Sequence, residues 1–242
     1  MAQSFRSLGY IQRSASSKDN QTTLCFLAGF RSDVTNSLKS DAIADLAKEY
    51  GYGFLGWHGK NNDGRFANNV ATWADDSVAL IQEKVQGRLV LAGASMGLWL
   101  ALLVAQRCRS IDGILGIGGG IHFTERWLEQ EVPPEHRNDP NFVWQRPSAY
   151  DPDGHYDIPV RFLLGSRKAL FPETIEVHCP VQLIHGAQDR DVPLSHAKAL
   201  AKRIRASSIK LNVIPDGDHR LSRPEDLACI RSAMLSLVKD RR

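Results

Sequence analysis

A serine between two glycines is the most prominent candidate for chemistry in this chain. Residues 93–97 form the motif G-x-S-x-G, with Ser95 at its centre. An apolar run at 89–92 precedes the motif, and a second one at 98–105 follows it. This order predicts a strand, a sharp turn and a helix with the serine at the apex, exposed as a nucleophile at one end of a sheet. A plain glycine-rich connection with an ordinary serine is the alternative.

Two later segments each place a candidate partner for this serine just after a predicted strand. The run at 181–186 is followed by Asp189, and the run at 211–214 is followed by a loop that contains His219. Serine, then aspartate, then histidine is the chain order of α/β-hydrolases. Because parallel strands end at one edge of a sheet, we expect the three side chains to converge there.

Such a group would perform nucleophilic catalysis. We predict Ser95 as the nucleophile, His219 as general base and acid, and Asp189 as the carboxylate that orients the imidazole. The acids that compete for the last role are Asp191, Asp216 and Asp218. The first is expected to cap the following helix, and the other two flank the histidine too closely in sequence to face its ring. His185, inside a predicted strand, is interpreted as a packed core residue.

Acyl transfer also needs an oxyanion hole, a pair of N–H donors for the negative oxygen of the tetrahedral intermediate. The N–H of Met96, directly after the serine, is one predicted donor. The second is expected from the loop after the strand at 22–28, where the N–H of Phe30 is the candidate. The alternative for this loop is a plain turn at the end of a strand.

Runs typical of strands and of helices alternate through most of the chain. The expected strands are 22–28, 53–57, 88–92, 111–117, 181–186 and 211–214, and the expected helices are 38–50, 68–85 and 95–108. Residues 5–13 are expected to form a pair of edge strands, followed by a polar connection at 16–21. The alternation predicts one α/β domain, residues 1–242, with a mostly parallel central sheet covered by helices on both faces.

The alternation breaks at residues 121–171, which contain six prolines and two tryptophans. This stretch is too long for a simple connection, so we predict a cap over the site, with a surface excursion as the alternative. Trp127 and Trp144 in the cap and His58, placed in the loop after the strand at 53–57, are the candidate substrate contacts. The alternatives are tryptophans that only fill the core of the cap and an ordinary loop histidine.

Composition argues against several classes of protein. A net charge of +3 with dispersed basic residues gives no reason to expect a nucleic-acid partner. The four cysteines have no zinc spacing, and the glycines at 116–120 lack the lysine of a phosphate loop, so no metal or cofactor is expected. No run reaches membrane-spanning length. A cytoplasmic protein is expected, or a mitochondrial one, because residues 1–18 have the arginines, serines and lack of acids of a transit peptide.

These residues carry a resemblance to a known family. The segments involved are 27–33, 93–97, 147–150, 179–186, 192–193 and 218–221. They resemble the α/β-hydrolase superfamily, and most of all its branch of mitochondrial acyl-glucuronide esterases and palmitoyl-protein thioesterases with their bacterial relatives. The resemblance implies Ser95, Asp189 and His219 as the triad and Phe30 and Met96 as oxyanion donors, without a metal or organic cofactor. Relatives often have a glycine where this chain has Leu98.

The expected function is therefore that of a serine hydrolase that cleaves carboxylic esters or thioesters through an acyl-enzyme on Ser95. The substrate would be a small molecule or an acylated protein. One alternative is a serine peptidase that acts on short peptides. The other is a non-catalytic relative that binds ligands, since a fold alone does not establish chemistry.

Overall fold

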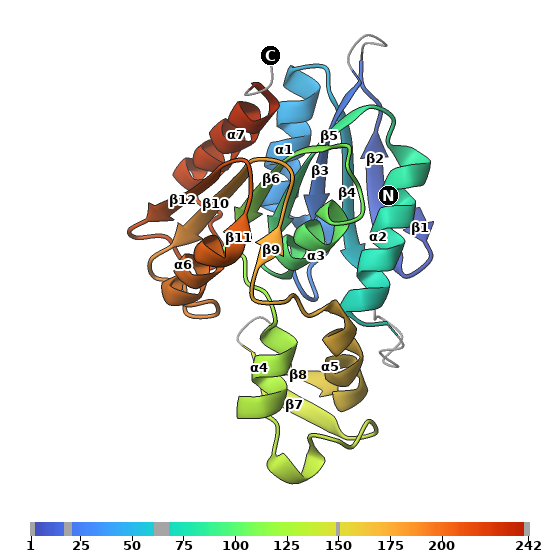
Figure 1. The fold of residues 1–242 in the computed structure, drawn as a ribbon, viewed down its shortest axis with the longest axis vertical. Coiled ribbons are helices and arrows are strands. Elements are labelled where there is room, and N and C mark those ends of the chain that lie inside the picture. The colour runs from blue at the N-terminus through green and yellow to red at the C-terminus, as the bar shows by residue number, and fades with distance from the viewer. Residues whose placement is uncertain (1–2, 17–20, 61–67, 149–150, 240–242) are drawn as a thin grey trace.

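The computed structural model describes residues 3–16, 21–60, 68–148 and 151–239, and they fold around an eight-stranded sheet (Figure 1). In spatial order its strands are β1 (Gln3–Phe5), β2 (Leu8–Arg13), β4 (Gly53–Gly59), β3 (Thr22–Leu27), β5 (Arg88–Ala94), β6 (Ile111–Ile117), β10 (Val181–Gly186) and β12 (Ile209–Ile214). The pairs β1–β2 and β2–β4 are antiparallel, and all other neighbours are parallel. The predicted mostly parallel sheet is confirmed.

Helices cover both faces of the sheet. One face packs against α1 (Leu38–Glu49) and α7 (Pro224–Lys239). The other packs against α2 (Val70–Lys84), α3 (Met96–Ala105) and α6 (Leu194–Arg203). Among the described residues, no helix is long and apolar enough to cross a membrane.

Strand β3 shows how the sequence produces these two cores. Side chains alternate between the faces of a strand, so Leu24 and Phe26 enter the core beneath α1 and α7. Cys25 and Leu27 enter the core on the opposite side. All four side chains are buried, as expected of a strand with helices on both sides.

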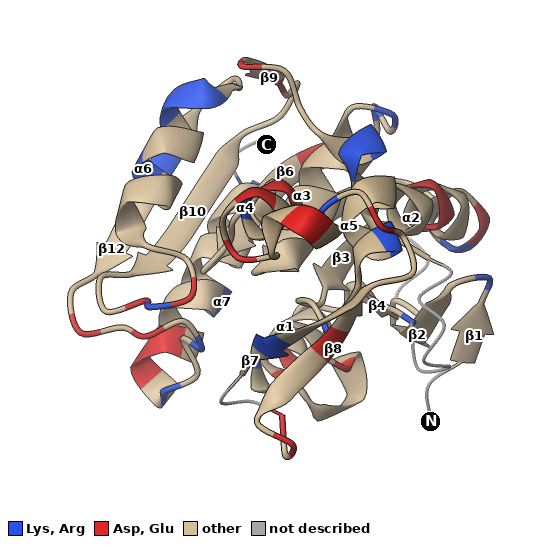
Figure 2. Cartoon of the chain, turned by 90° about the horizontal axis from the view of Figure 1, so that it is seen from below, with Lys and Arg blue, Asp and Glu red and all other residues tan. Residues whose placement is uncertain are grey.

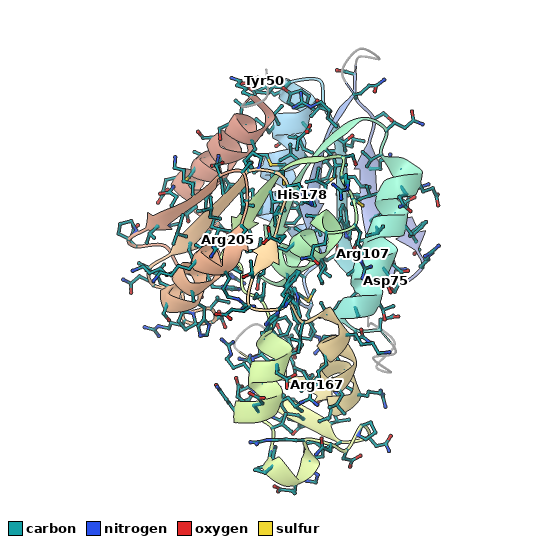
Figure 3. The ribbon with its side chains drawn as sticks, viewed as in Figure 1. Tyr50, Asp75, Arg107, Arg167, His178 and Arg205 are labelled. Carbon is teal, nitrogen blue, oxygen red and sulfur yellow. The ribbon has the colours of Figure 1, made fainter. Side chains whose placement is uncertain are left out.

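Capping residues set the start of α1 and α2. The side chain of Ser37 accepts a hydrogen bond from the N–H of Ser40 and so begins α1. Asn69 does the same for α2 by accepting from Ala71 and Thr72, which is why this helix starts two residues later than predicted. Arg107, just after α3, forms an ion pair with Asp75 of α2 and ties these neighbouring helices together (Figure 3).

The N-terminal segment is part of the sheet. Leu8 and Tyr10 of β2 are buried, and β2 pairs with β4 along its whole length. The predicted pair of edge strands is therefore confirmed. The predicted polar connection at 16–21 falls mostly on residues 17–20, outside the described residues.

The chain between β6 and β9 (Ile175–Glu176) forms a separate lobe below the carboxyl ends of the parallel strands (Figure 1). Its elements are α4 (Phe123–Gln130), η2 (Pro134–His136), β7 (Val143–Pro147), β8 (His155–Pro159), α5 (Val160–Ser166) and η3 (Arg167–Ala169). The strands β7 and β8 form an antiparallel hairpin. Arg167 makes two short hydrogen bonds to Glu125, of 2.6 and 2.9 Å, which tie η3 to α4 (Figure 3). After the lobe, β9 pairs with β11 (Ile204–Arg205), at the end of α6.

Candidate active site

Ser95 lies between β5 and α3 in a strained backbone conformation, with φ 51° and ψ −118°. Its N–H donates to the carbonyl of Ile117, which holds the turn against β6. Glycine is needed at both motif positions because any side chain there would clash with nearby backbone. A Cβ at Gly93 would lie 2.3 Å from the carbonyl oxygen of Gly97, and a Cβ at Gly97 would lie 2.1 Å from that of Leu27. The turn thus has the geometry predicted for a nucleophile elbow.

The structure brings the three predicted catalytic side chains together. His219 Nε2 lies 3.2 Å from Ser95 Oγ, and its Nδ1 lies 2.8 Å from Asp189 Oδ2. A carboxylate only accepts hydrogen bonds, so Nδ1 carries the proton and Nε2 is the acceptor for the serine hydroxyl. This is the tautomer that a general base needs.

Asp189 is fixed by its own backbone neighbours. Its side chain is fully buried, and its Oδ1 accepts hydrogen bonds from the N–H groups of Asp191 and Val192, at 2.9 and 2.8 Å. These donors compensate for the removal of the charge from water. His185 is buried as predicted, and its Nε2 donates to the carbonyl of Val192 at 2.8 Å. The same Nε2 lies 3.3 Å from Asp189 Oδ2, a proximity that we did not predict.

The competing acids have other partners or positions. Asp216 pairs with Arg223, and the side chain of Asp218 accepts from the N–H of Leu221. Asp191 was expected to cap α6, and that prediction was wrong. The residue before α6 is Pro193, and this helix has no side-chain cap.

The two candidate oxyanion donors lie on segments that approach the serine. Met96 begins α3, and the first N–H groups of a helix have no acceptor within the helix. The loop after β3 passes so close that a Cβ at Gly29 would lie 3.2 Å from Ser95 Cβ. Phe30 follows directly in this loop, and both Phe30 and Met96 line the same cavity as the serine and histidine.

This cavity has a volume of about 750 Å³ and lies between the strand ends and the inserted lobe. Trp127 lines it, and the indole Nε1 of this residue is buried without a hydrogen-bond partner among the described residues. Trp144 and His58, the other two candidate substrate contacts, are not among its lining residues. Trp144 instead packs against Trp127 within the lobe, at 5.9 Å between ring centroids.

His58 lies outside the cavity because β4 is longer than expected. The strand extends to Gly59, and His58 pairs with Gly9 of β2. Its ring packs directly over Gly9, where a Cβ would lie 2.5 Å from its Nε2, and its Nδ1 accepts from the N–H of Val34 at 3.4 Å. Burial lowers the pKa of His58, which fits a neutral ring inside the protein.

Charge is unevenly distributed around the cavity. Of the described lining residues, the basic ones are Arg31, Lys39, Arg126, Arg146, Arg203 and Arg220, and the acidic ones are Asp33 and Asp191. Arg126 of α4 lies 3.0 Å from Nδ1 of His196 on α6, so the lobe and the main body meet here. Figure 2 views the molecule from the lobe side and shows the basic residues along α6. The cavity therefore contains the Ser95–His219 pair, and the charged residues in its lining are mainly cationic.

Leu98 accounts for two glycines at the end of β6 and just after it, Gly116 and Gly119. A Cβ at Gly116 would lie 2.7 Å from the Leu98 side chain, and one at Gly119 only 2.4 Å away. These two glycines thus make room for the side chain of Leu98. Their role is in packing around the helix that follows Ser95, which agrees with the absence of a phosphate-loop motif.

Asp189, Asp191 and His219 also offer one ligand atom each within 4.8 Å of one another. A metal ion there would compete with hydrogen bonds that the structure already contains. Both oxygens of Asp189 accept from N–H donors, and one of those donors is the ring of His219. The arrangement fits a proton-transfer chain better than a metal centre.

We predict that Gly97→Ala disrupts the elbow. The added methyl group would meet the backbone of β3 rather than a flexible side chain. The free energy of unfolding should fall by about 1–3 kcal/mol, as for other overpacked sites. Denaturant unfolding measures this change, and an unchanged midpoint would contradict the assigned packing.

We predict a pH-dependent contribution of His122 to stability. Its Nε2 accepts from the N–H of Phe171 at 2.8 Å, and burial, aided by Arg203, lowers the pKa of the ring from 6.5 to about 4. The folded state therefore favours the neutral ring. Its contribution to stability is present above pH 6.5 and is lost as the pH falls toward 4. Urea unfolding of wild type and His122→Gln across this range should show the larger loss in wild type, and equal losses would refute the assignment.

Known proteins that are similar to this chain include a thioesterase and hydrolases. No protein-family model matches the chain. The chain is 26% identical over 211 residues to the mitochondrial palmitoyl-protein thioesterase ABHD10 of Mus musculus. The alignment covers 84% of this chain and 71% of that protein.

Two solved structures match nearly the whole chain. A putative hydrolase from Agrobacterium vitis S4 superposes with a TM-score of 0.85 and 26% identity, covering 96% of this chain and 93% of the other. Alpha/beta hydrolase domain-containing protein 10 from mouse gives a TM-score of 0.82 at 23% identity, covering 97% and 95%. The chain therefore has the α/β-hydrolase fold, and within that fold it resembles the mitochondrial ABHD10 thioesterases and a bacterial hydrolase.

Proposed function

We propose that this protein is a serine hydrolase that cleaves carboxylic esters or thioesters through an acyl-enzyme on Ser95. One observation carries the proposal. The hydrogen-bonded chain from Ser95 through His219 to the buried Asp189, with steps of 3.2 and 2.8 Å, opens into a cavity of about 750 Å³. The thioesterase names of the curated relatives support the same reaction class.

In the acylation step, Ser95 Oγ attacks the acyl carbon and its proton passes to His219 Nε2. The imidazolium that forms is stabilised by Asp189, which remains a carboxylate. The carbonyl oxygen becomes an oxyanion, for which the N–H groups of Phe30 and Met96 are the proposed donors. His219 then gives its proton to the departing alcohol or thiol, and the acyl group stays on the serine.

Deacylation repeats these steps with water as the nucleophile. His219 takes a proton from the water, which attacks the acyl carbon, and the serine recovers its proton as the acid leaves. No step requires a metal or organic cofactor. The inserted lobe, residues 121–171, is proposed to act as the cap that shields this chemistry from bulk solvent.

The proposed acyl-binding surface is the apolar part of the cavity lining. It is formed mainly by Ile121, Phe123 and Trp127 of the cap, with Leu200 of α6 on the opposite wall. Trp127 is 7% exposed, so most of its side chain packs inside the protein although it lines the cavity. The substrate is proposed to be a small acyl compound or an acylated side chain of another protein.

All four cysteines are free thiols, and three of them are buried. A reducing compartment is therefore proposed, either the cytoplasm or the mitochondrial matrix. The curated mammalian relatives are named as mitochondrial proteins.

We predict that Ser95→Ala lowers hydrolysis of p-nitrophenyl esters and acyl-CoA thioesters by at least about 10³-fold. Asp189→Asn should lower kcat by roughly 10³–10⁴-fold, because an amide favours the wrong tautomer of His219. Ser236→Ala on α7 is the matched control and should behave like wild type. An active Ser95→Ala variant, or wild-type Ser95 that resists fluorophosphonates, would refute the proposal. Cleavage of peptide p-nitroanilides alone would instead identify a peptidase.

The cationic lining also predicts a preference among esters. We compare two esters that have the same acyl chain. The ester whose leaving group carries a carboxylate or phosphate should have a higher kcat/KM than its neutral analogue. Salt should reduce this preference. Arg126→Gln, in the cavity wall, should also reduce it, whereas Arg205→Gln, outside the lining residues, should not. An equal kcat/KM for both esters at low salt would exclude a role for the charge.

A further inference from the structure

The proposed second oxyanion donor, the N–H of Phe30, lies in a tight turn after β3. The N–H of Ser32 donates to the carbonyl of Gly29 at 3.2 Å, which closes a four-residue turn with Phe30 and Arg31 at its centre. Arg31 adopts a positive φ of 55°, a backbone conformation that a side chain other than glycine's rarely adopts. A turn with this geometry needs support from the surrounding structure.

That support comes from the cap through the ring of Phe30. Four cap aromatics surround this ring, with centroid distances between 5.4 and 6.2 Å: Phe123, Trp127, Tyr156 and Phe162. They come from α4, β8 and α5, three of the six elements of the cap. Rings at these distances attract one another in tilted and edge-to-face arrangements. The side chain of the oxyanion loop is therefore inserted into the aromatic core of the cap.

Arg31 provides a second attachment to the same surface. Its guanidinium lies 4.8 Å from the centroid of the Tyr156 ring, in a cation–π arrangement. Both central residues of the turn are thus in contact with the cap.

Phe162 connects this cluster to the main body of the protein. It is fully buried and lies 5.6 Å from Trp73 of α2, as well as 5.4 Å from Phe30. It is not among the residues that line the cavity. Phe162 can therefore influence the reaction only through the residues that it supports.

We propose that the cap assembles the oxyanion hole, and that Phe162 is a positioning residue that holds the N–H of Phe30 toward Ser95. This inference rests on the proposed function. It gives the cap a task in the chemical step, beyond the selection of substrate and the exclusion of water. Displacing the cap would move the Phe30 donor and leave the Met96 donor, which is fixed by α3, in place.

The test is the substitution Phe162→Leu, compared with Phe142→Leu. Phe142 is also a cap aromatic, but it stacks on His136, at 3.8 Å between centroids, and does not line the cavity. Loss of an oxyanion donor costs about 10²–10³-fold in kcat, so a misplaced donor should cost roughly 10-fold. We expect this fall in kcat for Phe162→Leu with KM changed by less than about twofold, because the lost interaction is made only in the transition state. Phe142→Leu should retain the wild-type kcat.

A second pair of variants keeps the test decisive if Phe162→Leu does not fold. The ring of Phe30 is only half-buried, so Phe30→Leu removes the anchor with less effect on folding. We expect it to lower kcat as Phe162→Leu does. Phe30→Tyr, which retains a ring, should lose less kcat than Phe30→Leu.

Inhibition by a trifluoromethyl ketone with the same acyl chain gives an independent readout. Ser95 Oγ adds to its carbonyl carbon, the proton passes to His219, and the resulting oxyanion occupies the same hole. Its inhibition constant should rise in each variant by the factor by which kcat/KM falls.

Three results would overturn the inference: an unchanged kcat in folded Phe30→Leu and Phe162→Leu, a change in KM alone, or an equal loss in Phe142→Leu. Each would leave the proposed function intact as long as hydrolysis still depends on Ser95. An active Ser95→Ala variant would instead refute the proposed function itself.

Discussion

The geometry around Ser95 depends on direct backbone contact between the first turn of α3 and the end of β3. A Cβ at Gly97 would lie 2.1 Å from the carbonyl oxygen of Leu27, so only glycine permits this approach. The contact brings Gly29, just after β3, against Ser95. The segments of the two proposed oxyanion donors, far apart in sequence, thereby meet beside the serine. The strained conformation of the serine is the cost of that approach, and the hydrogen bond to β6 helps to maintain it.

A second close contact of backbones positions the other half of the site. A Cβ at Gly186, the last residue of β10, would lie 2.2 Å from the carbonyl oxygen of Gly217 in the loop after β12. This contact holds the loop that carries His219 against the loop that carries Asp189. Oδ1 of the carboxylate accepts from two N–H groups of its own turn, which fixes Oδ2 as the partner of the imidazole.

The sequence predicted the architecture and the convergence of three side chains because both follow from local patterns. Short apolar runs mark buried strands, and the ends of parallel strands share an edge. Ser95, Asp189 and His219 could therefore be placed together from the sequence. The lateral pairing of strands is not local. Pairing with β2 extends β4 through His58 and turns a predicted loop residue into a buried one. Similarly, composition marked Trp144 as an aromatic of the insertion, but its packing against Trp127 is a property of the folded lobe.

The two ends of the cap meet where the N–H of Phe171 donates to His122. A segment that leaves and re-enters the domain at one point can change in length and content without altering the sheet. The proposed cap is such a segment. The insertion of Phe30 into its aromatic core limits that freedom. A different cap would have to provide an aromatic pocket for this ring, or the loop would need another means of support. The sequences of the cap and of the loop are therefore expected to change together.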